Sequence, residues 1–155
     1  MRLQPNASVH ITIPDTVDKL DNDLNHLRNA DQVVALEVNA PLNGRSLESI
    51  ATLAKLEDLK LNKMDDFTPK QLEQLQALKQ LHTLYLRSAI YLRTPPDYTD
   101  EVLQVIGTLT QLRTLAVGTY KSRFSSQGVI ALKSLKDLKS LSFKSADPID
   151  AGLQE

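Results

Sequence analysis

A motif of regularly spaced apolar residues recurs along this chain, and it constrains the fold more than any other feature. Four segments align without gaps: AKLEDLKLNKM (54–64), KQLHTLYLRSA (79–89), TQLRTLAVGTY (110–120) and KDLKSLSFKSA (136–146). Each reads x-x-L-x-x-L-x-φ-x-x-x, where φ is Leu, Val or Phe. The segment 31–41 fits less closely, and we interpret 9–13 as a degenerate first copy. The last two apolar positions alternate with a period of two, which indicates a short strand in each copy.

The φ positions recur at nearly constant intervals. Their successive spacings are 25, 23, 25, 31 and 26 residues, and the residues are Ile13, Val38, Leu61, Leu86, Val117 and Phe143. Between the strands the apolar residues follow a helical period, as at Leu72, Leu75 and Leu78. Helix starts are predicted at a Thr68–Gln71 capping box with Pro at N1, and at the caps Ser46, Thr99 and Ser125 or Ser126. An earlier helix is expected over about 15–28.

A strand followed by a helix, repeated at about 25 residues, resembles the leucine-rich repeat family. The residues that carry this resemblance are Leu56-x-x-Leu59-x-Leu61, Leu81-x-x-Leu84-x-Leu86, Leu112-x-x-Leu115-x-Val117 and Leu138-x-x-Leu141-x-Phe143. It covers residues 31–146, and 9–30 weakly. The family usually places Asn or Cys three residues after the last leucine; here those positions hold Met64, Ala89, Tyr120 and Ala146. The chain therefore looks like a divergent, small stand-alone member without the asparagine ladder, whose turns must be satisfied otherwise.

One strand–helix unit cannot bury its apolar face alone, whereas stacked units share a continuous core. We therefore expect an α/β fold: a short leucine-rich-repeat-like solenoid of five to six strand–helix units with a curved parallel sheet. The whole chain, 1–155, is expected to form one domain. Within it, 9–30 is a degenerate N-terminal repeat, 31–146 holds the repeats, and 147–155 is a C-terminal tail.

Composition narrows the possible functions. The chain has no cysteine, which excludes disulfides, thiolate metal sites and a cysteine nucleophile. The net charge of −1 provides no strong field for nucleic acid or membrane, although residues 1–77 carry −4 and residues 78–155 carry +3. No apolar run approaches the roughly 18 residues of a membrane span, and no secretory signal is visible at the start. We expect a cytoplasmic protein that binds neither nucleic acid nor membrane.

Catalysis needs convergent polar groups, and the sequence contains no such set. The three histidines fall in different repeats at no metal-ligand spacing, and the five glycines are too scattered to form a phosphate-binding loop. The segment 21–25 resembles the start of a calcium loop, but His26 replaces the required glycine. We therefore predict a protein that is not an enzyme and that has no cofactor and no metal.

A binding surface is expected on the strands, because alternate residues of each strand point away from the core. The predicted outward residues are Ala35, Glu37, Asn39, Asp58, Lys60, Asn62, Thr83, Tyr85, Arg87, Thr114, Ala116, Gly118, Ser140, Ser142 and Lys144. Tyr85 and Arg87 are the most binding-like pair, because interface hot spots are enriched in Tyr and Arg.

Tyrosine and arginine are unevenly distributed along the chain. All four tyrosines lie between positions 85 and 120, together with several arginines. The 31-residue spacing adds a loop over 90–98 in the same region, which Pro95-Pro96 would stiffen. The predicted partner-binding residues are Tyr85, Arg87, Tyr91, Arg93, Tyr98, Tyr120, Arg123, Lys60 and Asp58.

The resemblance implies a non-catalytic module that binds another protein through its concave strand face and the 90–98 loop. One form of this hypothesis is an inhibitor, such as a bacterial immunity protein against a cognate toxin, that is monomeric when free. The alternative is an adaptor or regulatory subunit of a larger complex, including self-association. An enzyme or ligand-binding protein would instead require a polar pocket with clustered His, Asp or Glu.

Overall fold

Six parallel strands form one curved sheet in the computed structural model, which describes residues 8–15, 20–42, 44–64, 67–87, 98–119 and 122–145. Their spatial order follows the sequence, and they are β1 (Val9–Ile13), β2 (Val33–Val38), β3 (Asp58–Leu61), β4 (Thr83–Arg87), β5 (Thr114–Gly118) and β6 (Ser140–Lys144). The predicted α/β solenoid is therefore confirmed, and its first strand is the segment interpreted as a degenerate copy.

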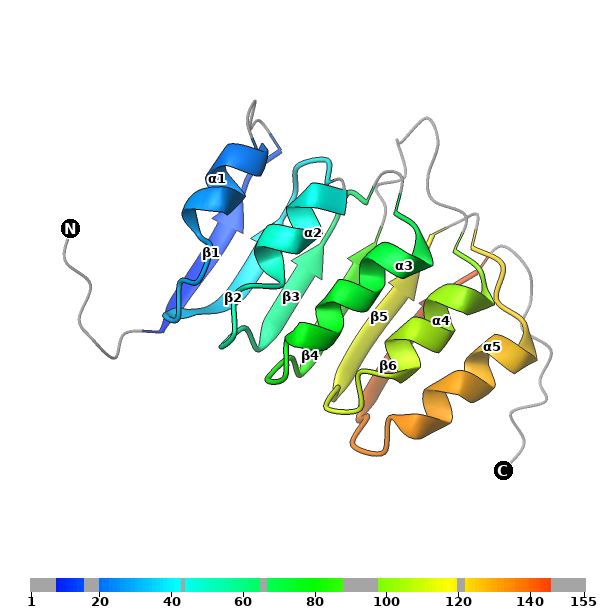
Figure 1. Ribbon diagram of the computed structural model, residues 1–155. Helices are drawn as coiled ribbons and strands as arrows, with labels where there is room; N and C mark the ends of the chain where they lie inside the picture. Colours follow the sequence, from blue (N-terminus) through cyan, green and yellow to red (C-terminus); the bar gives the residue numbers. More distant parts are fainter. Residues whose placement is uncertain are drawn as a thin grey trace.

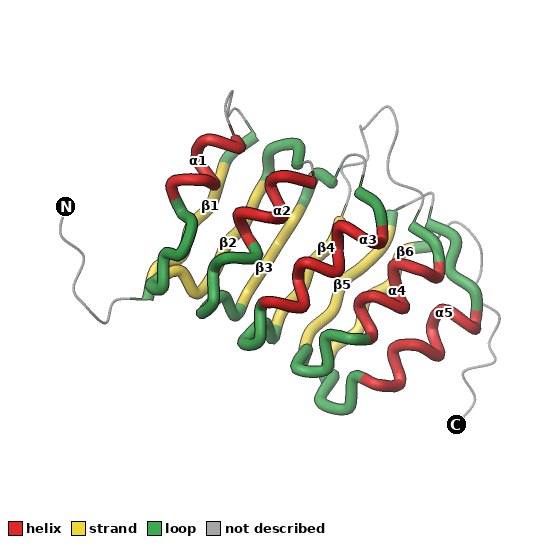
Figure 2. Tube along the Cα trace, viewed as in Figure 1, coloured by secondary structure: helices red, strands yellow, loops and turns green. Residues whose placement is uncertain are grey.

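The helices cover one face of the sheet and leave the other face open (Figure 1). They are α1 (Leu20–His26), α2 (Gly44–Ile50), α3 (Pro69–Leu72), α4 (Asp100–Gly107) and α5 (Ser126–Ile130). Two of them continue as 3₁₀ turns, α3 into η1 (Glu73–Ala77) and α5 into η2 (Ala131–Ser134). Figure 2 shows the two layers, strands on one side and helices on the other. Within the described ranges, no helix is both long and apolar enough to traverse a lipid bilayer.

The alignment of the repeats in sequence is also their register in space. Along the sheet, Leu59 pairs with Leu84, which pairs with Leu115 and then with Leu141 on β6. The φ positions form the next row in the same manner. Because each leucine lies beside the equivalent leucine of the next repeat, the apolar side chains form a continuous core between sheet and helices.

The predicted helix caps are confirmed in part. Thr68 and Gln71 form the capping box, with the Thr68 Oγ1 accepting from the Gln71 N–H at 3.3 Å and the Gln71 Oε1 accepting from the Thr68 N–H at 2.8 Å. Ser125 caps α5. Thr99 is the N-cap of α4 without a side-chain cap bond. The cap predicted at Ser46 is wrong, because this residue lies inside α2, where its hydroxyl donates to Asp21 at 2.8 Å.

Glycine is required where β5 ends. Gly118 has φ +122°, and a Cβ on it would lie 2.0 Å from the Lys144 carbonyl oxygen of β6. No side chain fits at that distance, so the close approach of the last two strands depends on this residue. Beyond the ends of β2 and β3, the chains stay paired instead, through an isolated bridge between Leu42 and Met64.

Candidate protein-binding surface

The open face is the side of the sheet that the helices leave uncovered, and the strand register arranges its side chains in rows. Thr12, Glu37, Lys60, Tyr85, Ala116 and Ser142 form one row from β1 to β6. Adjacent members are about 4.8 Å apart along the backbone. Burial alternates as predicted on β3 and β4, whose leucines are fully buried and whose outward neighbours reach solvent.

Tyr85 lies in the middle of this face between two cations. The Lys60 Nζ is 5.6 Å from the centre of the Tyr85 ring, and the Arg87 Cζ is 5.5 Å from it. A cation against an exposed aromatic ring contributes about 0.5–1 kcal/mol. These contacts restrain all three side chains, so a partner would meet a partly ordered group.

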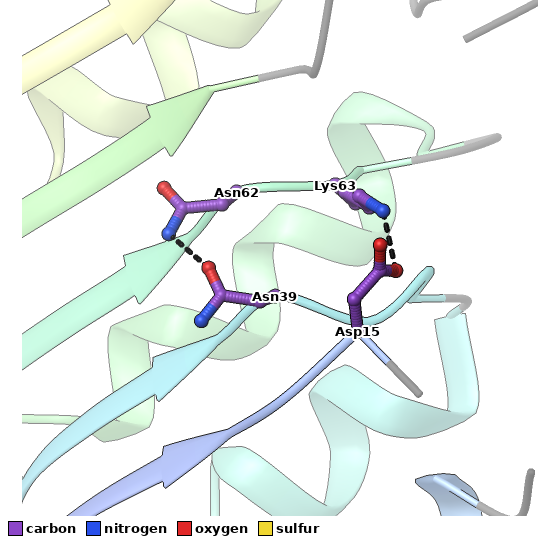
Figure 3. A network of polar contacts seen from close by, with 4 residues as sticks. All are labelled: Asp15, Asn39, Asn62 and Lys63. Carbon is purple, nitrogen blue, oxygen red and sulfur yellow. Dashed lines mark hydrogen bonds and ion pairs between the residues drawn. The ribbon is translucent and has the colours of Figure 1, made fainter. Parts of the chain in front are cut away.

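Asn39 and Asn62 form a hydrogen-bonded pair at the carboxyl ends of β2 and β3 (Figure 3). The Asn62 Nδ2 donates to the Asn39 Oδ1 at 2.8 Å and to the Glu37 Oε1 at 3.0 Å. Beside them Lys63 forms an ion pair with Asp15 of the first repeat (Figure 3). Asn39 and Asn62 were both predicted to point outward, but their hydrogen bond was not predicted. Each follows the φ position of its strand by one residue, in the dipeptides Val38-Asn39 and Leu61-Asn62, whereas the family's usual asparagine follows it by three.

A hollow lies at the β1–β3 end of the open face. Its volume is about 150 Å³, and its polar walls are His10, Thr12, Glu37, Asp58 and Lys60. Ala35 stands between His10 and Asp58 in the strand register, and its short side chain leaves the space open. We call this site the acidic hollow, because two carboxylates and one ammonium group, that of Lys60, line it. Across the described part of the chain, no three His, Cys, Asp or Glu side chains are placed to hold a metal ion.

The β5–β6 end of the face is lined by small residues. Ala116 and Gly118 occupy the outward rows as predicted, but both are buried, so they do not reach solvent as the prediction expected. Ser140, Ser142 and Lys144 are exposed on β6. The open face therefore changes along the solenoid, from acidic on β2, through mixed charge on β3 and an aromatic ring with a cation on β4, to small and basic on β5 and β6.

The structure brings four of the predicted contact residues together. Asp58, Lys60, Tyr85 and Arg87 lie on the adjacent strands β3 and β4, with Asp58 and Tyr85 half-buried and the two cations exposed. Arg123 is also exposed, but it lies beyond the end of β5. Tyr91, Arg93 and Tyr120, with most of the 90–98 segment, lie outside the described residues, so their part in binding stays a prediction.

The prediction for Tyr98 is wrong, because this side chain belongs to the core. It is 1% exposed, its hydroxyl donates to the Met64 Sδ at 3.1 Å, and burial raises the pKa of its phenol. Tyr98 precedes the N-cap of α4 just as Phe67 precedes that of α3 and Phe124 that of α5, and all three rings are buried. This is the N′ position of a hydrophobic staple, which packs against the first turns of its helix.

Comparison with known proteins supports the fold. No family model matches the sequence, and no curated protein matches it. Among solved structures the chain is similar to an internalin (inlF) from Listeria monocytogenes, a leucine-rich-repeat protein, with a TM-score of 0.50 and 12% sequence identity. The match covers 89% of this chain and 42% of the internalin chain, so this chain spans less than half the length of that protein. At this identity the likeness shows the fold alone, a leucine-rich-repeat-like solenoid.

Proposed function

We propose that this chain is a non-catalytic protein-binding module that contacts its partner through the open face around Tyr85. The observation that carries the proposal is the half-buried Tyr85 at the middle of the face, with Lys60 and Arg87 against its ring. Binding hot spots are enriched in Tyr and Arg and cluster near the centre of an interface. Side chains restrained before binding lose less conformational entropy when a partner docks.

Affinity capture from the native host tests this proposal. The wild type and Tyr85→Ala are compared by quantitative mass spectrometry, followed by affinity measurement on the captured protein. A hot-spot tyrosine contributes about 2 kcal/mol or more, so binding should weaken about 30-fold. The matched control is Ile130→Ala, which removes a large exposed apolar side chain, 44% exposed, from α5 on the helix side. Equal capture by the wild type and a correctly folded Tyr85→Ala would rule out this surface.

The narrower form of the proposal is an inhibitor that neutralises one cognate toxin, as bacterial immunity proteins do. Such an inhibitor forms a tight complex with a single partner, so the captured material should contain one protein in a one-to-one ratio. Native mass spectrometry of the complex measures that ratio. Many substoichiometric partners would contradict the inhibitor while leaving a binding module in place.

The alternative proposal is an adaptor that assembles through the β6 end of the solenoid. Leu141 of β6 is 43% exposed although its equivalents on β3, β4 and β5 are fully buried. No described strand pairs with the outer edge of β6. Light scattering over a range of concentrations tests self-association, and a strict monomer with an unchanged mass would count against it.

A further inference from the structure

Three basic residues of the open face lie around Tyr85 and toward β6. Lys60 and Arg87 contact the tyrosine ring, and Lys144 lies in the same row as Arg87, because both pair in register with Gly118. Two strand spacings separate the backbones of Arg87 and Lys144, which is about 10 Å. We call Lys60, Arg87 and Lys144 the basic cluster.

The described outward positions between Arg87 and Lys144 carry almost no side chain. Gly118 has none, and Ala116, which is beside Tyr85 in the register, is 2% exposed. Ser142 follows on β6. Because Ala116 and Gly118 are buried, a side chain from a partner would lie above them, with a cation on either side of it.

Within the basic cluster, Lys60 pairs in register with Glu37, whereas Arg87 and Lys144 both pair in register with Gly118. The ion pair between Lys63 and Asp15 lies far along the sheet from Lys144. The outward positions of β4, β5 and β6 contain no Asp or Glu. The Debye length is about 8 Å at physiological ionic strength, so the fields of Arg87 and Lys144 both reach the space over β5. An anionic group entering that space would be attracted from two sides.

The opposite end of the face has a small excess of negative charge, because Glu37 and Asp58 lie there with Lys60. Glu37 and Asp58 face the acidic hollow, and the Asn62 amide holds the Glu37 carboxylate in place. An acidic segment would be repelled there and attracted over β5. The hollow, at about 150 Å³, is also smaller than the roughly 300–1,000 Å³ of small-molecule pockets.

We propose that the partner is a protein that places an acidic segment over β5, with an Asp or Glu carboxylate between Arg87 and Lys144. This inference rests on the proposed function and specifies the chemistry of the partner. The guanidinium of Arg87 and the ammonium of Lys144 would donate charge-assisted hydrogen bonds to the carboxylate. Tyr85 would contact the apolar part of the same segment, and the acidic hollow would set the direction in which the segment lies.

Nuclear magnetic resonance titration tests the inference with a defined probe, acetyl-tetraglutamate amide. Saturable shifts are expected at the backbone amides of Arg87, Gly118 and Lys144, with a Kd on the order of 1 mM for so short a probe. Acetyl-tetraglutamine amide, which lacks the charge, should bind at least about tenfold more weakly. The double variant Arg87→Gln with Lys144→Gln should lose the tetraglutamate shifts by a similar factor. Its matched control, Lys70→Gln with Lys133→Gln, removes two exposed cations from the helix side and should change nothing.

Several results would overturn the inference. They are shifts confined to the helix-side lysines, equal binding of the glutamine probe, or unchanged binding by the Arg87 and Lys144 variant. Tighter binding of a short oligothymidylate at the same amides would point to nucleic acid instead. The titration and the capture experiment can fail independently. If the titration fails but Tyr85→Ala still loses the captured protein, the open face remains the binding surface and only the acidic segment is ruled out. Equal capture by Tyr85→Ala would remove the surface whatever the probe does.

Discussion

Tyr85 and Tyr98 contribute to different parts of the molecule. Tyr98 is enclosed by the core and bonded to Met64, whereas Tyr85 lies on the open face. Truncating a core aromatic side chain costs about 3–5 kcal/mol, so Tyr98→Ala should lose that much free energy of unfolding. Tyr85→Ala should lose about 1 kcal/mol or less, because it removes mainly cation–ring contacts. Urea unfolding followed by circular dichroism measures both, and equal losses would contradict the assignment.

Stability at high pH should depend on Tyr98. Burial raises the pKa of its phenol above the ordinary value of 10.0, so the folded state holds the proton where the unfolded state releases it. The stabilisation is complete below pH 10 and falls as the pH rises above 10, because unfolding then releases a proton. Tyr98→Phe cannot titrate, and its free energy of unfolding should fall less than that of the wild type between pH 9 and about 11. Parallel curves for the two proteins would show that Tyr98 does not contribute.

The position of Tyr98 could have been inferred from sequence, and that of the basic cluster only in part. Tyr98 stands immediately before a predicted N-cap, as Phe67 and Phe124 do, and that common position indicates a staple rather than a loop. The pairing of Tyr85 with Arg87 follows from strand alternation alone. The place of Lys144 beside Arg87 needs the register across β5, which the sequence fixes only through the alignment of the repeats.

At the scale of single elements, the contact between β5 and β6 tolerates substitution least, because Gly118 packs directly against the β6 backbone. Gly118→Ala would introduce a methyl group 2.0 Å from the Lys144 carbonyl oxygen, at a φ of +122° that side chains rarely adopt. The backbone strain alone costs about 1–3 kcal/mol, and displacement of β6 adds to it. We expect a lower urea midpoint for the variant, together with faster hydrogen exchange on β6.

A second glycine provides the control for that prediction. A Cβ on Gly44 would meet the end of the Gln71 side chain, whose movement would weaken its capping bond to the Thr68 N–H, but no strained φ is involved. Gly44→Ala at the start of α2 should therefore change stability by about 1 kcal/mol or less, in either direction. A loss as large as that of Gly118→Ala would show that close packing, rather than backbone conformation, decides the effect.

For the whole molecule, the sequence repeat predicts far more of the fold than amino-acid composition does. The alignment of four segments in sequence gave the order, direction and register of the strands, because stacked units must place equivalent leucines side by side. Three features depended on contacts between repeats and were not predictable from one repeat at a time. These are the acidic hollow above Ala35, the Asn39–Asn62 pair, and the burial of Ala116.

In a solenoid each repeat is stabilised by its neighbours, so equivalent leucines should contribute unequally to stability. Leu84 on β4 is fully buried between two strands, whereas Leu141 on β6 is 43% exposed with a strand on one side. Leu84→Ala should cost about 2–5 kcal/mol, and Leu141→Ala about 1 kcal/mol or less. Native-state hydrogen exchange should show β6 opening before β4 in the wild type, since end units are the least constrained. Equal costs for the two substitutions would mean that Leu141 is covered in solution, as the adaptor alternative requires.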